Sequence, residues 1–185
     1  MAVKNATKSI MEQFYGTITP DANAGGFSLL PITSKEGAPA RAQYLMEFRD
    51  VSVKIAKTSG VPYINARLAV VEPDCFENRG FFTMFYIPVP TESTSPEDLK
   101  KMNTNTTRTM GQLDIILGEG SAMTALGSFH DVATLGEALR DLAGDLEGER
   151  VVVQVGVQVG TDEYPDSKNV VKKYIAVDKW EGEEN

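Results

Sequence analysis

The sequence predicts a mainly β fold, a small barrel of five strands with a helical segment between the third strand and the fourth. Two observations lead to this prediction. Apolar and polar residues alternate in five stretches of the chain, which is typical of strands. Between the third and fourth stretches, residues 90–147 carry the capping residues and apolar spacing of helices.

The first predicted strand begins at Tyr44 and contains a change of phase. Its apolar residues occupy even positions before Asp50 and odd positions after it. One extra residue in a strand exchanges its two faces, so this change predicts a β-bulge near Asp50. The apolar residues are Tyr44, Met46 and Phe48 before the change, and Val51, Val53 and Ile55 after it.

Two further strands are predicted to follow as a meander. A turn at residues 57–60 precedes a strand over 61–71, and a turn at residues 73–80 precedes an aromatic strand over 81–89. In the earlier of these strands the residues outside the core are predicted to be Tyr63, Asn65 and Arg67. The aromatic strand leaves open which set faces outward, either Phe82, Met84 and Tyr86 or Phe81, Thr83 and Phe85.

The helical segment contains several predicted boundaries. Ser95 followed by Pro96 predicts a capped helix start, and Thr107 predicts the start of a second piece that ends at Gly118. A capping-box spacing predicts a further helix over residues 134–143.

Strand alternation returns over residues 151–160, and a last strand is predicted over residues 170–177. The order β-β-β-α-β-β is that of the OB barrel, in which a bent first strand is also expected. Another small α+β sheet would show the same order. We therefore predict an N-terminal arm over residues 1–40, an OB domain over 41–177 with its helical connection at about 90–147, and an acidic tail over 178–185.

The charge of the chain is unevenly distributed. The 185 residues include 18 Lys and Arg against 26 Asp and Glu, a net charge of −8, which disfavours nucleic acid at first sight. Residues 1–110, however, hold 12 basic and 11 acidic residues, whereas residues 111–185 hold 6 and 15. The single cysteine excludes an internal disulfide, and no apolar stretch approaches the roughly 20 residues that span a bilayer. We expect a cytoplasmic protein with no membrane contact.

The sequence favours neither an enzyme nor a metal or cofactor site. His130 is the only histidine, in a predicted helix lead-in, and no strand–turn–helix elbow frames a nucleophile near it. Residues 118–120 lack the glycines and the lysine of a phosphate-binding loop. The acidic residues at 162–166 lack calcium-loop spacing and indicate a solvated turn, and Cys75 is expected to be half-buried.

Basic and aromatic residues converge instead on the strands that an OB barrel presents to oligonucleotides. Aromatic faces stack on bases and cations contact phosphates when single strands are bound. The alternative is that the aromatic residues belong to the core and the charges to a solvated rim. The predicted binding residues are Arg49, Lys54, Lys57, Arg67, Arg79, Lys172 and Lys173 for phosphates, and Tyr63, Phe82 and Tyr86 for bases.

The stretch "KTSGVPYINARLAVVEPDCFENRGFFTMFYIPV", residues 57–89, resembles phage-type single-stranded DNA-binding proteins with an OB fold. The resemblance rests on the Lys-to-Gly turn at 57–60, on Tyr63 and Arg67, on the Arg79-Gly80 step into the aromatic strand, and on the Asn-Val-Val at 169–171. It implies sequence-tolerant binding of single-stranded DNA during phage replication or recombination, in the host cytoplasm.

The resemblance also implies that the acidic tail docks replication or recombination proteins, and it leaves a homo-oligomer open. The tail lacks a hydrophobic last residue, so a solubilising end is the alternative. The rival to DNA binding is an OB-like protein-interaction or phage assembly module. Pairing of Arg67 and Arg79 with Glu72, Asp74 and Glu77 would neutralise the groove and favour that rival.

Overall fold

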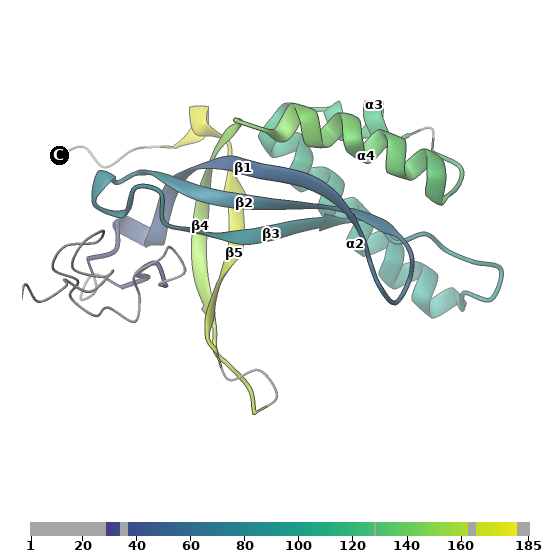
Figure 1. Cartoon of the computed structure of the whole chain (residues 1–185), viewed down its shortest axis with the longest axis horizontal. Helices are drawn as coiled ribbons and strands as arrows, with labels where there is room; N and C mark the ends of the chain where they lie inside the picture. Colours follow the sequence, from purple (N-terminus) through teal and green to yellow (C-terminus); the bar gives the residue numbers. More distant parts are fainter. Residues whose placement is uncertain (1–28, 34–36, 128, 163–165, 181–185) are drawn as a thin grey trace, which may run out of the picture.

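A computed structural model describes residues 29–33, 37–127, 129–162 and 166–180. Five antiparallel strands form one sheet in the order β3-β2-β1-β4-β5 (Figure 1). The strands are β1 (Gln43–Ile55), β2 (Pro62–Glu72), β3 (Gly80–Tyr86), β4 (Arg150–Gln158) and β5 (Lys168–Ile175). Three helices lie between β3 and β4 in the chain, α2 (Pro96–Leu117), α3 (Ser121–Leu126) and α4 (Val132–Leu146).

The structure confirms a β-rich fold of five strands but corrects its class and order. The chain is mixed α/β, because the connection after the third strand contains three helices, α3 among them with no counterpart in the predicted pieces. The hydrogen-bonded sheet is open, with β3 and β5 as its two edges, so a closed barrel is not established by the strand ladder. Most of the predicted arm and the end of the predicted tail, residues 1–28, 34–36 and 181–185, lie outside the described residues.

The predicted β-bulge in the first strand is confirmed. Arg49 pairs with Arg67 of β2, but the next pair is Ser52 with Asn65, and Asp50 between them has a φ of 53°. The bulge lets β1 change direction, so that its residues 43–47 pair with β4 while residues 45–55 pair with β2. In Figure 1 β4 and β5 accordingly cross β1, β2 and β3 at a steep angle.

Helix α2 begins where the sequence predicts and does not break where the sequence predicts. The hydroxyl of Ser95 accepts the Asp98 N–H at 3.1 Å, and Gly118, with a φ of 104°, ends the helix. The predicted second start at Thr107 is wrong because the helix is continuous to Leu117. Threonines inside a helix can bond to carbonyls instead of capping, and Thr109 does so toward Tyr86 O at 3.3 Å.

Helix α4 is longer at both ends than the sequence predicts. Its N-cap is Asp131, whose carboxylate accepts the Thr134 N–H at 2.8 Å, so Thr134 is the third helical residue rather than the cap. The helix continues past Gly144 because its apolar face extends to the fully buried Leu146. It packs against β1 and β2, while α2 packs against β3 and β5.

The core lies inside the curled sheet and holds residues from both sheet edges. Phe48 of β1, Phe85 of β3 and Tyr174 of β5 form an aromatic cluster with ring centroids 6.0–6.4 Å apart. The Thr83 and Tyr174 hydroxyls lie 3.0 Å apart and join β3 to β5. Burial raises the pKa of Tyr174 to about 12. The two edge strands therefore meet through side chains.

Candidate functional site

The residues of β1, β2 and β3 that point away from the core form a surface that we call the outer grid. Strand register places them in three rows, about 7 Å apart along β2 and β3, with the bulge of β1 between its first two rows. The rows are Arg49, Arg67 and Phe82; Ser52, Asn65 and Met84; and Lys54, Tyr63 and Tyr86. The structure thus brings together six of the ten sequence-predicted binding residues on one face.

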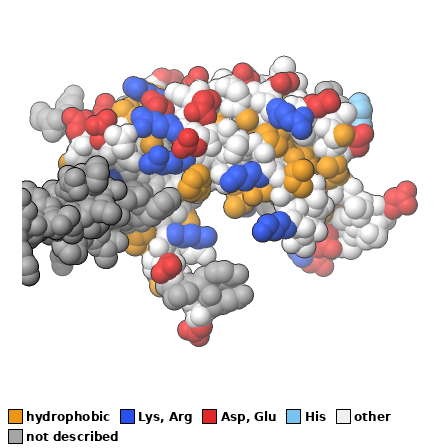
Figure 2. Space-filling model, viewed as in Figure 1, with side chains coloured by type: hydrophobic (Ala, Val, Ile, Leu, Met, Phe, Trp, Pro, Cys, Tyr) orange, Lys and Arg blue, Asp and Glu red, His pale blue; other side chains and the backbone are white. Residues whose placement is uncertain are grey.

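The outer grid exposes apolar side chains among its charges. On β3, Phe82 is 50% exposed and Met84 is 65% exposed, whereas Phe81 and Phe85 of the same strand are buried. The structure therefore decides which set of this strand faces outward. Figure 2, in which β1, β2 and β3 lie in front, shows Lys and Arg side chains interspersed with hydrophobic ones on this side of the molecule.

At one end of the outer grid, two neighbouring arginines converge on a single asparagine of the β2–β3 turn. Arg49 donates from Nη1 to Asn78 Oδ1 at 2.7 Å, and Arg67 donates from Nη2 to the Asn78 carbonyl at 2.8 Å. Asn78 has a φ of 64°, a left-handed conformation that asparagine tolerates better than most residues. The two guanidinium groups are therefore held side by side with several donors still unused.

Carboxylates partly balance the two arginines. Glu47 accepts a hydrogen bond from Arg49 Nε at 2.8 Å and another from Arg150 Nε at 3.1 Å. The hydrogen bond from Arg49, followed by that from Arg150 and the charge of both guanidinium groups, outweighs partial burial and lowers the pKa of Glu47. Asp50 lies 3.9 Å from Arg67 and is 72% exposed, so that pair is weak.

The opposite end of the outer grid, which we call the lysine end, carries positive charge that no carboxylate balances in the described chain. Lys54 and Lys57, in the last part of β1 and the following turn, are exposed and form no ion pair with any described residue. The turn contains Gly60 with a φ of 68°, and its Ser59 hydroxyl lies 3.4 Å from the Tyr86 hydroxyl. This end therefore combines two cations with the phenol rings of Tyr63 and Tyr86.

Arg79 does not belong to the outer grid. Its backbone pairs with Val70, which points into the core, so its side chain lies on the core side of the sheet. There it donates to Leu29 O at 2.7 Å and its guanidinium lies 5.2 Å from the centroid of the Phe76 ring. The next residue, Gly80, has no room for a side chain, because a Cβ at that position would lie 1.9 Å from Leu68 O.

Lys172 and Lys173 lie on β5, away from the outer grid. A register shift at this point of β5 places the Lys172 side chain over Gly156, where an added Cβ would lie 2.3 Å from Lys172 Cε. Lys173 pairs with Gln154 and lines a separate open pocket. The structure thus divides the ten predicted residues into seven at the grid or its adjoining turn, two on β5 and one behind the sheet.

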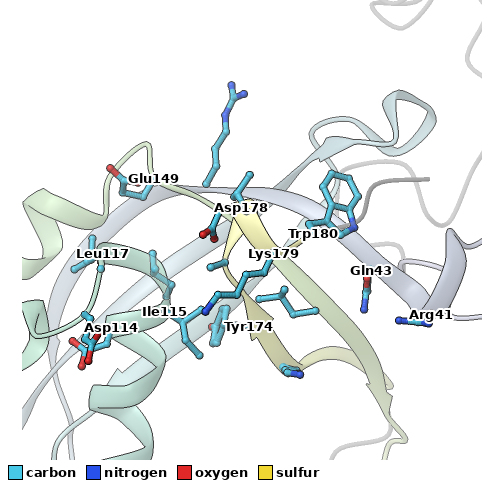
Figure 3. Close-up of a pocket in the computed structure, with 18 of the residues that line it drawn as sticks. Arg41, Gln43, Asp114, Ile115, Leu117, Glu149, Tyr174, Asp178, Lys179 and Trp180 are labelled. Carbon is cyan, nitrogen blue, oxygen red and sulfur yellow. The ribbon is translucent and has the colours of Figure 1, made fainter. Parts of the chain in front are cut away.

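That pocket, of about 1360 Å³, lies where the end of α2 meets β5 and the short helix η4 (Val177–Lys179). Figure 3 shows Lys179 extending across it toward Ile115, with Trp180 and Arg41 at the other side. Its basic side chains, Arg41, Arg150, Lys173 and Lys179, are matched by the acidic ones, Asp114, Glu119, Glu149 and Asp178. The lining is therefore close to neutral and does not select a charged ligand.

Other candidate chemistry is sparse in the part of the chain that the structure describes. His130 is exposed immediately before α4, next to the capping Asp131. Cys75 is exposed rather than half-buried, because its neighbour Phe76 makes the apolar contact with Tyr44. Within the described residues no three His, Cys, Asp or Glu side chains gather as metal ligands. None of the described helices combines the length and the hydrophobicity of a membrane span.

Sequence reasoning missed the two residues that organise the arginine end, Glu47 and Asn78. Glu47 carries a signal, since it stands two positions before Arg49 in a strand and so shares its face. Asn78 carries none, because its role depends on the conformation of the β2–β3 turn, which places its side-chain and main-chain oxygens within reach of Arg49 and Arg67.

Comparisons with known proteins add no relationship. No protein-family model, curated protein or solved structure matches this chain.

Proposed function

We propose that this protein binds single-stranded DNA without strong sequence preference, on the outer grid of an OB-type sheet. The observation that carries the proposal is the register of β1, β2 and β3, which interleaves Arg49, Arg67 and Lys54 with Phe82, Tyr63 and Tyr86 on one face. Phe82 is half exposed, whereas Tyr63 and Tyr86 are half-buried and Tyr86 also packs against the core. Aromatic rings between cations are the combination that binds single strands, since any base can stack while phosphates meet the cations.

The topology of the sheet supports an OB-type fold in this proposal. Strand β1 pairs with both β2 and β4, and the two edges, β3 and β5, meet at Thr83 and Tyr174. The sheet has four ladders, and closure of the barrel would need only this side-chain seam in place of a fifth ladder between β3 and β5. A fold of this kind leaves the outer side of the first three strands open to a ligand.

The charge pattern is compatible with a nucleic-acid ligand despite the net charge of −8. Arg67 contacts Asp50 weakly at 3.9 Å, and its guanidinium bonds to a neutral carbonyl rather than to Glu72, Asp74 or Glu77 in the described chain. The neutral groove that would favour a protein-interaction module is thus not formed by those residues. Because Glu47 and Asp50 offset part of the charge, the proposal entails modest affinity that depends on salt.

Fluorescence anisotropy with a labelled oligothymidine of about 30 nucleotides tests the proposal. Binding should weaken steeply as salt rises, because each neutralised phosphate releases counterions. Arg67→Ala should bind more weakly and lower the slope of log affinity against log salt by about 1. Arg140→Ala, which removes an exposed arginine of α4, is the matched control and should change neither value. Absence of binding at low salt would overturn the proposal.

A further inference from the structure

A short segment, residues 29–32, is fastened to the sheet by side chains from three separate places. We call it the strap. The amide of Asn169 at the start of β5 accepts the Leu30 N–H at 2.7 Å and donates to Leu30 O at 3.3 Å. Arg79 of the β2–β3 turn donates to Leu29 O, and the Tyr44 hydroxyl donates to Pro31 O. Leu30 itself is 1% exposed, so it anchors the strap in the core.

The strap and the arginine end of the outer grid meet at one dipeptide of the β2–β3 turn. On the core side, Arg79 bonds to the strap. On the outer side, its neighbour Asn78 accepts hydrogen bonds from both Arg49 and Arg67. The two residues are held together by the ladder, because Asn78 N–H donates to Val70 O at 3.0 Å and Val70 N–H donates to Arg79 O at 2.7 Å.

The Arg79 side chain has few hydrogen-bond acceptors other than the strap among the described residues. Its guanidinium lies against the Phe76 ring, which in turn contacts Tyr44 edge-on at 5.9 Å. Its Nε is buried and has no hydrogen-bond partner among the described residues. The hydrogen bond from Arg79 to Leu29 O is exposed, so loss of the strap would release this end of the guanidinium to water and remove the contact that fixes it. The turn that carries Arg79 would then be less restricted.

We infer that the strap positions Arg49 and Arg67 for nucleic acid, acting through Arg79 and Asn78. The inference rests on the proposed function and adds a regulating element to the same site. With the strap in place, Asn78 orients both guanidinium groups, so a phosphate meets donors whose rotamers are already restricted. When the strap leaves, the turn and both arginines lose that order, and the site binds nucleic acid more weakly.

Two substitutions remove different contacts between the strap and the β2–β3 turn. Leu30→Ala removes the anchor of the strap, and Arg79→Met keeps an unbranched side chain against Phe76 but removes every donor. Matched controls lie among the helices. Leu126→Ala truncates a buried leucine of α3, and Arg140→Met removes one positive charge from α4. All four are made in the full chain.

Nuclear magnetic resonance without nucleic acid measures the connection itself. Leu30→Ala and Arg79→Met should each shift the Nε–H signals of Arg49 and Arg67 and speed hydrogen exchange at the Asn78 amide, and the two controls should not. Unchanged arginine signals in both variants would overturn the inference. This measurement does not depend on whether the protein binds DNA, so it judges the inference even if the wild type fails to bind.

Oligothymidine binding measures the consequence. Each of the two variants should weaken binding about three- to tenfold and lower the salt slope by about 1 to 2, the contribution of two phosphate contacts. The double variant should bind no more weakly than Arg79→Met alone, because both changes interrupt one connection. Affinity equal to or above that of the wild type would overturn the inference while leaving the proposed function standing, whereas a wild type that does not bind refutes the proposed function.

Discussion

The two faces of β3 both carry phenylalanine, but one face is buried in the core and the other is open to solvent. Phe85 on the inner face is 1% exposed and completes the aromatic cluster with Phe48 and Tyr174. Phe82 on the outer face is 50% exposed and stands in a row with Arg67 and Arg49. Phe82 and Phe85 are three positions apart, and because side chains alternate along a strand this odd spacing places them on opposite faces. Aromatic residues on one face hold the fold together, and we propose that those on the other face are available to a ligand.

Truncation of one phenylalanine on each face gives the largest contrast. Phe85→Ala should lower the free energy of unfolding by about 3–5 kcal/mol, because it empties a closely packed site. Phe82→Ala should lower it by less than about 1 kcal/mol, since half of the side chain is already in water. Urea unfolding followed by circular dichroism measures both values. Equal losses would contradict the assignment of the two faces.

The inner face should also be sensitive to alkaline pH. Because burial raises the pKa of Tyr174 to about 12, its phenol stays protonated in the folded state while the unfolded chain ionises near pH 10. The stability it contributes is present below pH 10 and is lost as pH rises toward 12, by about 2–3 kcal/mol. Tyr174→Phe has no such proton, so its stability should fall less over the same interval. Parallel curves for the two proteins would contradict this prediction.

On the outer face the same aromatic truncation should act on binding instead. Phe82→Ala should weaken oligothymidine binding by about 1–3 kcal/mol, the contribution of one stacked base. Met123→Ala provides a control, because Met123 is an apolar side chain of α3 with 61% exposure. Anisotropy titrations of both variants at low salt measure the difference. A loss shared by the control would indicate a general surface effect rather than stacking.

The smallest expected effect concerns Glu47, which lies between the arginines of the outer face. The hydrogen bond from Arg49 is the first cause that lowers the pKa of Glu47, so its stabilising effect is present above the unfolded pKa and is lost as pH falls through the lowered value. Glu47→Gln should therefore cost less than about 1 kcal/mol near pH 7 and should flatten the acid limb of the stability curve. Denaturant unfolding from pH 6 down to pH 3 tests this expectation.

Local patterns predicted the elements well, and contacts between distant segments account for what they missed. The phase change at Asp50 predicted the bulge, and Ser95 and Gly118 predicted both ends of α2, because each depends on neighbours in the chain. The predicted break at Thr107 is wrong because the helix that Ser95 caps continues without interruption to Leu117, and Thr109 inside it bonds to Tyr86 O rather than capping a new helix. The extra helix α3 has no strong pattern over its six residues.

The candidate site was predictable to the extent that strand alternation fixes a face. Tyr63 and Arg67 follow from the phase of β2, and they lie on the outer grid as predicted. Arg79 has the residue type of a phosphate contact but lies behind the sheet, since the turn after β2 shifts its phase. The position of Lys172 depends on a register shift in β5 that the valine-rich sequence does not reveal.

The central claim is that the outer grid binds single-stranded DNA through neighbouring cations and aromatic rings. The most direct measurement is oligothymidine affinity at low salt for the wild type and for the double variant Tyr63→Ala/Arg67→Ala, with folding checked by circular dichroism. We predict salt-dependent binding by the wild type and a loss of at least about tenfold in a folded double variant. Unchanged affinity in the folded double variant would contradict the claim.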